Sequence, residues 1–214
     1  MNNSEIAVID YGVGNLLSVS KALEYCGAKV RIISKPEDLL SFSKVVLPGV
    51  GAFSYAMKEL SNRGLDVAIK KIVNRGDTLL GICLGMQLLL DESEEFGVTK
   101  GLGLIPGRVI PIPIKFNNIE HKIPHIGWSE IHKSKKNLDW QNTVLQSTSN
   151  RDSFYFVHSF MAQPDKIKHQ LASCLYGGIN IPTVLKNKNI IGCQFHPEKS
   201  GNSGLNFLNS FLKI

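Results

Sequence analysis

The chain has 214 residues, 43% of them hydrophobic, which is enough to bury the core of one domain but leaves no room for a second catalytic domain of ordinary size. Its formal net charge is +6, but the lysines are scattered, and "HKSKKN" (132–137), which lacks interleaved aromatic residues, is expected to be a solvated loop, so nucleic-acid binding is poorly supported. No run of about eighteen apolar residues predicts a membrane span, and the first residues do not resemble a signal peptide, so we expect a cytoplasmic protein.

The first hundred residues alternate between short apolar strands and amphipathic helices. Strands are predicted where apolar runs are bounded by turn residues, at 5–10, 29–34, 44–49 and 77–83. Helices are predicted where apolar residues recur at helical spacing, at 16–27, 53–64, 65–76 and 84–93. This alternation predicts an α/β fold, with an open, mostly parallel sheet covered by helices on both faces.

The second half of the chain has a different sequence pattern. β-Branched and aromatic runs interrupted by Gly, Pro and Asn predict an antiparallel β excursion around 105–180. A last strand at 189–195 is expected to rejoin the main sheet, and a closing helix at 204–214 carries Leu205, Leu208 and Leu212 on one face. No repeat or linker interrupts the chain, so we expect a single domain over residues 1–214.

One cysteine stands on a predicted bend between a strand and a helix. "GICLG" places Cys83 between Gly81 and Gly85, which is the pattern of a nucleophile elbow that presents a reactive side chain at the carboxyl edge of a sheet. The helix N-terminus favours a thiolate, and the amide of Leu84 is a candidate oxyanion donor. A buried structural cysteine is the alternative. The other cysteines, Cys26, Cys174 and Cys193, form no C-x-x-C or zinc-type pattern with it, so we expect reduced thiols, no metal and no cofactor.

A candidate base lies near the end of the last strand. In "FHPE", His196 and Glu198 are two residues apart, so in an extended chain both point to the same face. Pro197 restricts the residue before it to extended conformations. Glu198 could then orient the imidazole and stabilise its charged form, although a surface pair at a strand edge would look the same.

A glycine-rich turn follows the third predicted strand. "PGVG" (48–51) allows close backbone approach and leaves amide groups free, so Val50 or Gly51 could supply a second oxyanion donor. An ordinary strand-to-helix turn is the alternative. "GVGN" (12–15) lacks the third glycine of a dinucleotide-binding motif and gives weak support for phosphate binding.

Taken in order, the motifs PGVG, GICLGMQ and QFHPE resemble those of the class I glutamine amidotransferases. Four further stretches make the chain look like the glutaminase subunit of an imidazole glycerol phosphate synthase: "IDYGVGNLLSV", "MQLLLDESEE", "IPHIGWSE" and "FYFVHSF". The resemblance covers nearly the whole chain and implies a flavodoxin-like glutaminase fold. It also implies that Cys83 attacks the side-chain amide of glutamine, that His196 transfers the protons and that Glu198 orients His196.

The resemblance implies further site residues. Glutamine would be bound by Gly49, Gln87, Glu95 and the backbone around His158 and Ser159. Gln87 is plausible on its own, because it lies one helical turn beyond Cys83 on the same face. His158 could equally be a histidine at the edge of the core.

A partner chain is also implied, because the glutaminase uses up all 214 residues. In the resembled family the partner is a (β/α)₈-barrel cyclase that takes the ammonia and makes imidazole glycerol phosphate, so a heterodimer is expected. Tyr11, Asn15, His125 and Trp128 match interface stretches of that family. A protein interface would use an exposed Trp128, whereas a core tryptophan on a strand is the alternative.

Two departures from the family pattern leave other functions open. Ser129 stands where the family usually has Asn, and the segment 109–125 is longer than expected. One alternative is therefore a paralogous glutaminase that supplies ammonia for the amidination of a surface-polysaccharide sugar. A stand-alone cysteine hydrolase such as a γ-glutamyl hydrolase, and a non-catalytic binding module, are two further alternatives.

Overall fold

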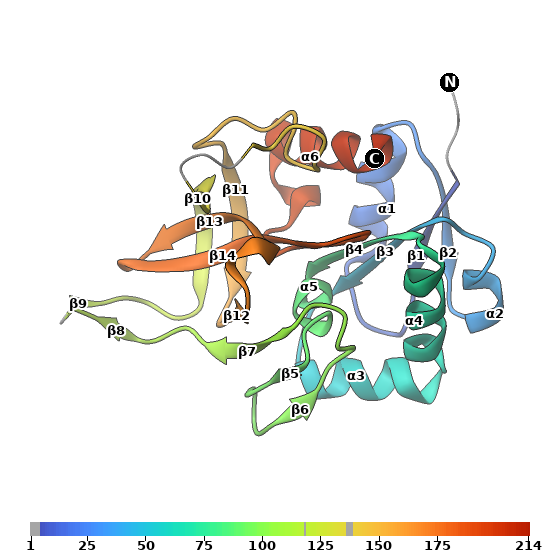
Figure 1. Ribbon diagram of the computed structural model, residues 1–214, viewed down its shortest axis with the longest axis horizontal. Coiled ribbons are helices and arrows are strands. Elements are labelled where there is room, and N and C mark those ends of the chain that lie inside the picture. The colour runs from blue at the N-terminus through green and yellow to red at the C-terminus, as the bar shows by residue number, and fades with distance from the viewer. Residues whose placement is uncertain (1–4, 118, 136–138) are drawn as a thin grey trace.

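The computed structural model describes residues 5–117, 119–135 and 139–214 (Figure 1). The expected lysine loop at 132–137 therefore lies partly outside the described residues. A nine-stranded sheet runs through the molecule in the order β11-β10-β13-β14-β15-β4-β3-β1-β2. Its strands are β1 (Glu5–Ile9), β2 (Lys29–Ile33), β3 (Lys44–Gly49), β4 (Thr78–Cys83), β10 (His125–Lys133), β11 (Ser153–His158), β13 (Gln170–Tyr176), β14 (Ile179–Asn187) and β15 (Ile190–Cys193).

Parallel and antiparallel strands occupy different halves of this sheet. β2, β1, β3, β4 and β15 are parallel to one another, whereas β14, β13, β10 and β11 are paired antiparallel. The last predicted strand does rejoin the main sheet, because β15 pairs with β4 in the register Cys193 to Ile82. The predicted α/β class, the parallel first half and the antiparallel excursion are confirmed.

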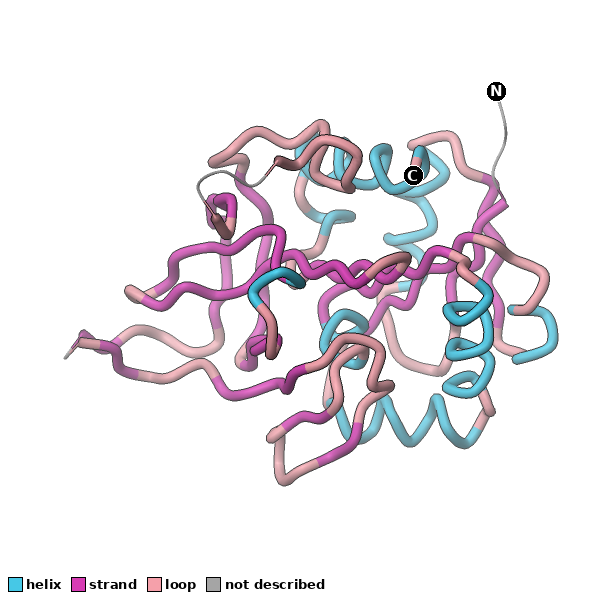
Figure 2. The backbone as a smooth tube through the Cα atoms, in the orientation of Figure 1, coloured by secondary structure: helices cyan, strands magenta, loops and turns pink. Residues whose placement is uncertain are grey.

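Two small sheets lie outside the main one (Figure 2), and they combine strands of the excursion with two strands that precede it. The first has the order β12-β7-β5-β6, and the second is a hairpin of β8 and β9 that projects from the rest of the molecule (Figure 1). Their strands are β5 (Glu92–Ser93), β6 (Thr99–Lys100), β7 (Gly107–Pro111), β8 (Lys115–Phe116), β9 (Ile119–Glu120) and β12 (Phe160–Pro164). The long segment 109–125 noted in the sequence contains this projecting hairpin.

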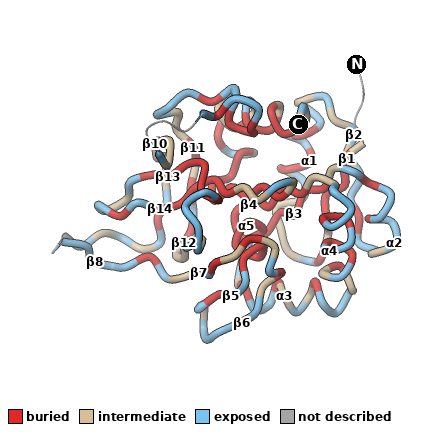
Figure 3. The backbone as a smooth tube through the Cα atoms, in the orientation of Figure 1, coloured by how far each residue is buried: buried red, intermediate tan, exposed pale blue. Residues whose placement is uncertain are grey.

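Helices cover both faces of the main sheet. α1 (Leu16–Tyr25) and α6 (Gly201–Lys213) lie on one face, and α3 (Phe53–Asn62), α4 (Leu65–Arg75) and α5 (Leu84–Leu88) lie on the other (Figure 1). The short helix α2 (Pro36–Leu39) and the 3₁₀ turns Ile167–His169 and Pro197–Lys199 complete the set. The central strands of the sheet are mostly buried (Figure 3). Neighbouring residues of a strand enter opposite cores: Val8 packs with α1 and α6, and Ile9 packs with α3 and α4. No helix in the described part of the chain is long and apolar enough to cross a membrane.

One local prediction was wrong. The helix expected at 84–93 ends at Leu88, because the carbonyl groups of Leu88, Leu89 and Leu90 accept hydrogen bonds from the 102–105 segment and β5 begins shortly afterwards. The predicted closing helix is confirmed as α6, with Leu208 in the core. Its buried residues are Gly204, Phe207, Leu208, Ser210 and Phe211, whereas Leu205 and Leu212 are only partly buried.

Candidate active site

Cys83 stands on the sharp bend between β4 and α5. Its backbone angles, φ 55° and ψ −111°, lie in a region that non-glycine residues rarely adopt, so the packing around the bend must hold it there. The flanking glycines are required sterically. A Cβ on Gly81 would lie 2.6 Å from the carbonyl oxygen of Gly85, and a Cβ on Gly85 would collide with the carbonyl oxygen of Leu47. These contacts have the geometry that the elbow pattern predicts.

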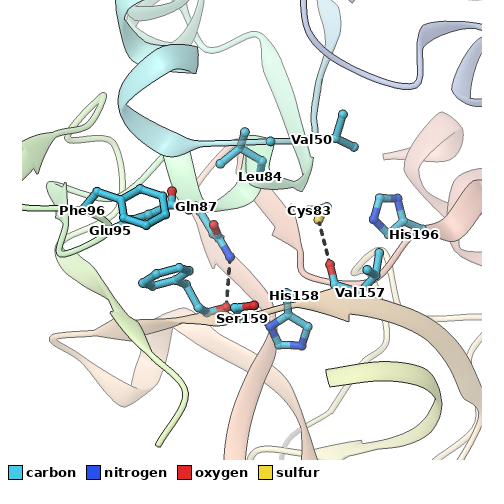
Figure 4. A pocket seen from close by; sticks show the side chains of 12 residues that line it. Val50, Cys83, Leu84, Gln87, Glu95, Phe96, Val157, His158, Ser159 and His196 are labelled. Carbon is cyan, nitrogen blue, oxygen red and sulfur yellow. Dashed lines mark hydrogen bonds between the residues drawn. The ribbon is translucent and has the colours of Figure 1, made fainter. Parts of the chain in front are cut away.

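A cavity of about 480 Å³ opens over this bend (Figure 4). Its volume is in the range of sites for small molecules. It is lined by Val50, Gly51, Cys83, Leu84, Gln87, Glu95, Phe96, Val157, His158, Ser159, Phe160 and His196. Cys83 and His196 stand at one end, and Gln87, Glu95 and Phe96 stand at the other. The thiol and the imidazole, which are 113 residues apart in the chain, therefore share one cavity.

His196 is paired with Glu198 at the wall of the cavity. Its Nδ1 atom lies 2.8 Å from Glu198 Oε1, and the two side chains are 4% and 1% exposed. The pair was predicted, but its backbone differs from the expected extended strand: Glu198 stands in the 3₁₀ turn Pro197–Lys199. A carboxylate at Nδ1 directs the other ring nitrogen, Nε2, to exchange protons. Nε2 is buried and has no hydrogen-bond partner among the described residues.

The surroundings of His196 favour its charged form. Burial by itself disfavours an imidazolium, but the polar contacts and negative charges of Cys83 and Glu198 outweigh it and raise the pKa of His196 to about 10. Since no hydrogen bond joins His196 Nε2 to Cys83 in this geometry, the influence of Cys83 is one of proximity. An imidazolium beside a thiol stabilises a thiolate, which is the nucleophilic form of cysteine.

Two further groups touch the sulfur of Cys83. The amide Nε2 of Gln194 lies 3.8 Å from Sγ and can donate to a thiolate. On the other side, the carbonyl oxygen of Val157 lies 4.0 Å from Sγ and can accept only from the protonated thiol (Figure 4). Sequence reasoning missed both groups. Gln194 was within a recognised motif, but its contact with the thiol depends on the pairing of β15 with β4.

The structure brings most of the predicted glutamine-binding residues to the cavity. Gln87, Glu95, His158 and Ser159 line it, but Gly49 does not and instead packs against the hydroxyl of Tyr11. The Nε2 group of Gln87 donates to the carbonyl of Phe160 at 3.1 Å and to Gln194 Oε1 at 3.0 Å. Glu95 accepts a hydrogen bond of 2.6 Å from the amide of Phe53. These contacts hold the two polar side chains in fixed positions at the end of the cavity away from Cys83.

The residues predicted to receive an oxyanion also line the cavity. Leu84 begins α5 directly after the cysteine, and Val50 and Gly51 follow β3. Gly51 has φ +94°, a conformation that favours glycine. Beneath this loop, the hydroxyl of Tyr11 donates a 2.9 Å hydrogen bond to the carbonyl oxygen of Pro48.

Two of the four residues predicted to contact a partner are buried, so the prediction was wrong for these two. Tyr11 is 0% exposed and supports the PGVG loop, and His125 is 1% exposed and contacts His158. Trp128 is 58% exposed and is therefore not a core tryptophan, and Asn15 is partly exposed just before α1. Another feature missed from the sequence is Phe96, which lines the cavity although it is 89% exposed. Among the described residues, no group of three His, Cys, Asp or Glu side chains is arranged to hold a metal ion.

The sequence matches the family model of the class I glutamine amidotransferases over residues 7–214. A relative from Legionella pneumophila (strain Lens), imidazole glycerol phosphate synthase subunit HisH 1, is 48% identical over 99% of this chain and 100% of its own length. Subunits HisH of Geobacillus thermodenitrificans and Chlorobaculum tepidum are 45% and 40% identical, each over 98% of this chain and over 95% and 100% of their own lengths.

Solved structures share the fold at lower sequence identity. A glutamine amidotransferase superposes with a TM-score of 0.71 at 18% identity, over 96% of this chain and 98% of its own. The structure of PurLQS from Thermotoga maritima gives a TM-score of 0.70 at 19% identity, over 99% of this chain and 98% of the matched chain. At this identity the likeness concerns the fold alone.

Proposed function

This chain belongs to the class I glutamine amidotransferases, and from that premise we propose that it is the glutaminase subunit of an imidazole glycerol phosphate synthase. It hydrolyses L-glutamine to L-glutamate and ammonia, and the ammonia serves histidine biosynthesis in the cytoplasm. The observation that carries this proposal is the shared cavity of Cys83 and His196, with Glu198 at 2.8 Å from the imidazole. The HisH relatives, which match along their whole length, support the choice of synthase.

In the first half of the reaction, the thiolate of Cys83 attacks the side-chain amide carbon of glutamine. The carbonyl π pair moves to oxygen, and the resulting oxyanion lies near the amides of Leu84 and of the loop at Val50 and Gly51. When the tetrahedral intermediate collapses, the C–N bond breaks and His196 gives a proton to the leaving nitrogen, so that ammonia departs and a thioester remains.

In the second half, His196 accepts a proton from water, and the hydroxide formed attacks the thioester. A second oxyanion forms at the same place, the C–S bond breaks, and glutamate and the thiolate are regenerated. Glu198 stabilises the imidazolium form of His196 in each half. Gln87 and Glu95, at the far end of the cavity, would hold the polar α-carbon groups of glutamine.

The ammonia must reach a second active site, so we propose a heterodimer with a (β/α)₈-barrel cyclase that makes imidazole glycerol phosphate. The name of the relatives, a synthase subunit, supports a complex. Trp128 offers an exposed aromatic surface of the kind that interfaces use. The partner would contact the surface around Trp128, which lies on β10 opposite Tyr155 of β11.

The experiment compares glutamate release by the chain alone, by the chain with its co-purified synthase, and by the complex supplied with the ammonia acceptor. We expect little activity alone and much more in the full system. C83S should abolish glutamate release while sparing assembly and the synthesis driven by added ammonium salt. C26S, which changes a cysteine outside the cavity, is the matched control and should retain both activities.

Two results would contradict the proposal. Glutamine hydrolysis by C83S would exclude the assigned nucleophile. The paralogous function would be supported instead if the chain co-purified with an enzyme that amidates a polysaccharide sugar and a histidine-pathway cyclase did not stimulate glutamate release.

A further inference from the structure

Two buried histidines behind the cavity wall form a continuous chain of hydrogen bonds with a serine. His158 Nδ1 lies 2.8 Å from the carbonyl oxygen of Phe160, and His158 Nε2 lies 2.9 Å from His125 Nδ1. His125 Nε2 in turn lies 2.9 Å from the hydroxyl oxygen of Ser129. The two rings are 6% and 1% exposed, so their nitrogen atoms depend on one another for partners.

The groups at the two ends of this series of hydrogen bonds determine which atom donates in each one. A carbonyl oxygen only accepts hydrogen bonds, so His158 must carry its proton on Nδ1. Burial lowers the pKa of both rings, to about 3 for His158 and about 4 for His125, so each ring is neutral near pH 7. His158 Nε2 is then an acceptor, and His125 Nδ1 must donate to it. His125 Nε2 is left as an acceptor, and Ser129 must donate the last hydrogen bond.

The backbone and the neighbouring rings are shaped for this arrangement. Residues 125 and 129 of a regular strand are about 13 Å apart, which is farther than a His–Ser hydrogen bond can span. The strand therefore bends between them, and Gly127, with φ +136°, is where its backbone departs from regular geometry. The ring of His125 is stacked between Tyr176 and Phe156, with centroids at 4.0 and 4.9 Å.

The His158 end of this series of hydrogen bonds lies at the reaction cavity. His158 stands between Val157, whose carbonyl oxygen contacts the sulfur of Cys83, and Ser159, which lines the cavity. Its side chain is occupied by His125 and Phe160, so the segment meets a ligand with its backbone. We propose that His125 and Ser129 are positioning residues, which act through His158 to fix the backbone of 157–160 as the wall against which glutamine binds; the substrate named here rests on the proposed function.

The hydrogen-bond chain is tested first by the protonation of its rings, which does not depend on activity. In the protein labelled with ¹⁵N-histidine, two-bond ¹H–¹⁵N correlations report which ring nitrogen carries the proton. We expect both His125 and His158 as Nδ1–H tautomers, and S129A should shift the Nε2 resonance of His125. An Nε2–H tautomer at either ring would overturn the proposal.

The positioning role is tested by the kinetics of the complex with its synthase partner. S129A should raise the KM for glutamine by about three- to tenfold while kcat changes by less than about twofold, because the wall is displaced but the thiol and imidazole are not. S129T keeps the hydroxyl donor and should restore the KM. S153A, on the neighbouring strand β11, removes a hydroxyl that makes no side-chain hydrogen bond with the described residues and should change nothing.

The outcomes separate this inference from the proposed function. An unchanged KM in S129A, or an equal rise in S153A, would overturn the positioning role even if the tautomers are as expected. A wild-type complex that releases no glutamate would contradict both the proposed function and the positioning role. The tautomers of His125 and His158 would still test whether the predicted hydrogen bonds form.

Discussion

Replacing Glu198 by glutamine should weaken catalysis through its effect on His196. E198Q keeps the shape of the side chain and a carbonyl acceptor for His196 Nδ1, but it removes the negative charge 2.8 Å from the ring. Because both side chains are almost completely buried, water cannot replace the lost charge. The imidazolium that the reaction requires in both halves should therefore be less stable.

The size of the effect follows from the pKa of His196. Its rise from 6.5 to about 10 corresponds to roughly 5 kcal/mol in favour of the charged ring. Cys83 and Glu198 share this stabilisation, so removal of one charge should cost about 2–3 kcal/mol. Glutaminase kcat/KM should then fall by about 30- to 160-fold.

The assay is a pH profile of glutamate release by the complex, measured for the wild type, for E198Q and for E130Q, whose carboxylate is half exposed and lies near Arg151. The wild type should lose activity as the pH rises through about 10, where His196 deprotonates. In E198Q this alkaline limb should move down to about pH 8. E130Q should follow the wild type.

The same change should alter the pH dependence of stability. The pKa of His196 is higher in the folded chain than its unfolded value of 6.5, so its protonation stabilises the fold fully below pH 6.5, and this contribution is lost as the pH rises towards about 10. Denaturant unfolding at pH 6 and pH 10 should show a smaller difference in E198Q than in the wild type. An unmoved alkaline limb together with an unchanged pH dependence would refute the account of the His196–Glu198 pair.

Other substitutions test separate parts of the structure. G85A should lower the free energy of unfolding by at least about 1–3 kcal/mol in urea, because its Cβ collides with β3; an unchanged midpoint would contradict the steric reason for this glycine. Q194L should slow alkylation of Cys83 by about fivefold, since a donor to the thiolate is lost, and an unchanged rate would show that this 3.8 Å contact is inert. W128A should weaken the affinity for the synthase partner in titration calorimetry without changing Tm. Y11F should do the reverse, lowering stability by about 1 kcal/mol. A loss of stability in W128A, or a loss of partner affinity in Y11F, would contradict the placement of these side chains.

The parts of the site that depend on short-range geometry were predictable from the sequence. The bend at Cys83 was predicted because glycine on both sides of a cysteine, between an apolar run and a helical pattern, has a local steric cause, and the clashes at Gly81 and Gly85 are that cause. The His196–Glu198 contact was predicted for a partly wrong reason, since a 3₁₀ turn rather than an extended strand brings the carboxylate to the ring.

The parts that depend on pairing between distant strands were not predictable. The contact of His125 with His158 follows from the antiparallel register of β10 and β11, in which these two residues are direct partners. Tyr11 was assigned to an interface because its stretch matched one, and only the packing of β1 against β3 shows that its ring lies beneath Pro48. Likewise, α5 is short because a segment more than ten residues later takes its carbonyl groups.

In the proposed mechanism, Cys83 is the one thiol among four that is presented to the substrate cavity as the nucleophile. The most direct test of this assignment is labelling with an electrophilic diazoketone analogue of glutamine, followed by peptide mapping by mass spectrometry. We predict a single adduct on Cys83, formed faster in the complex and prevented by excess glutamine, with Cys26, Cys174 and Cys193 unmodified. An adduct on one of these three, with Cys83 unmodified, would contradict the account.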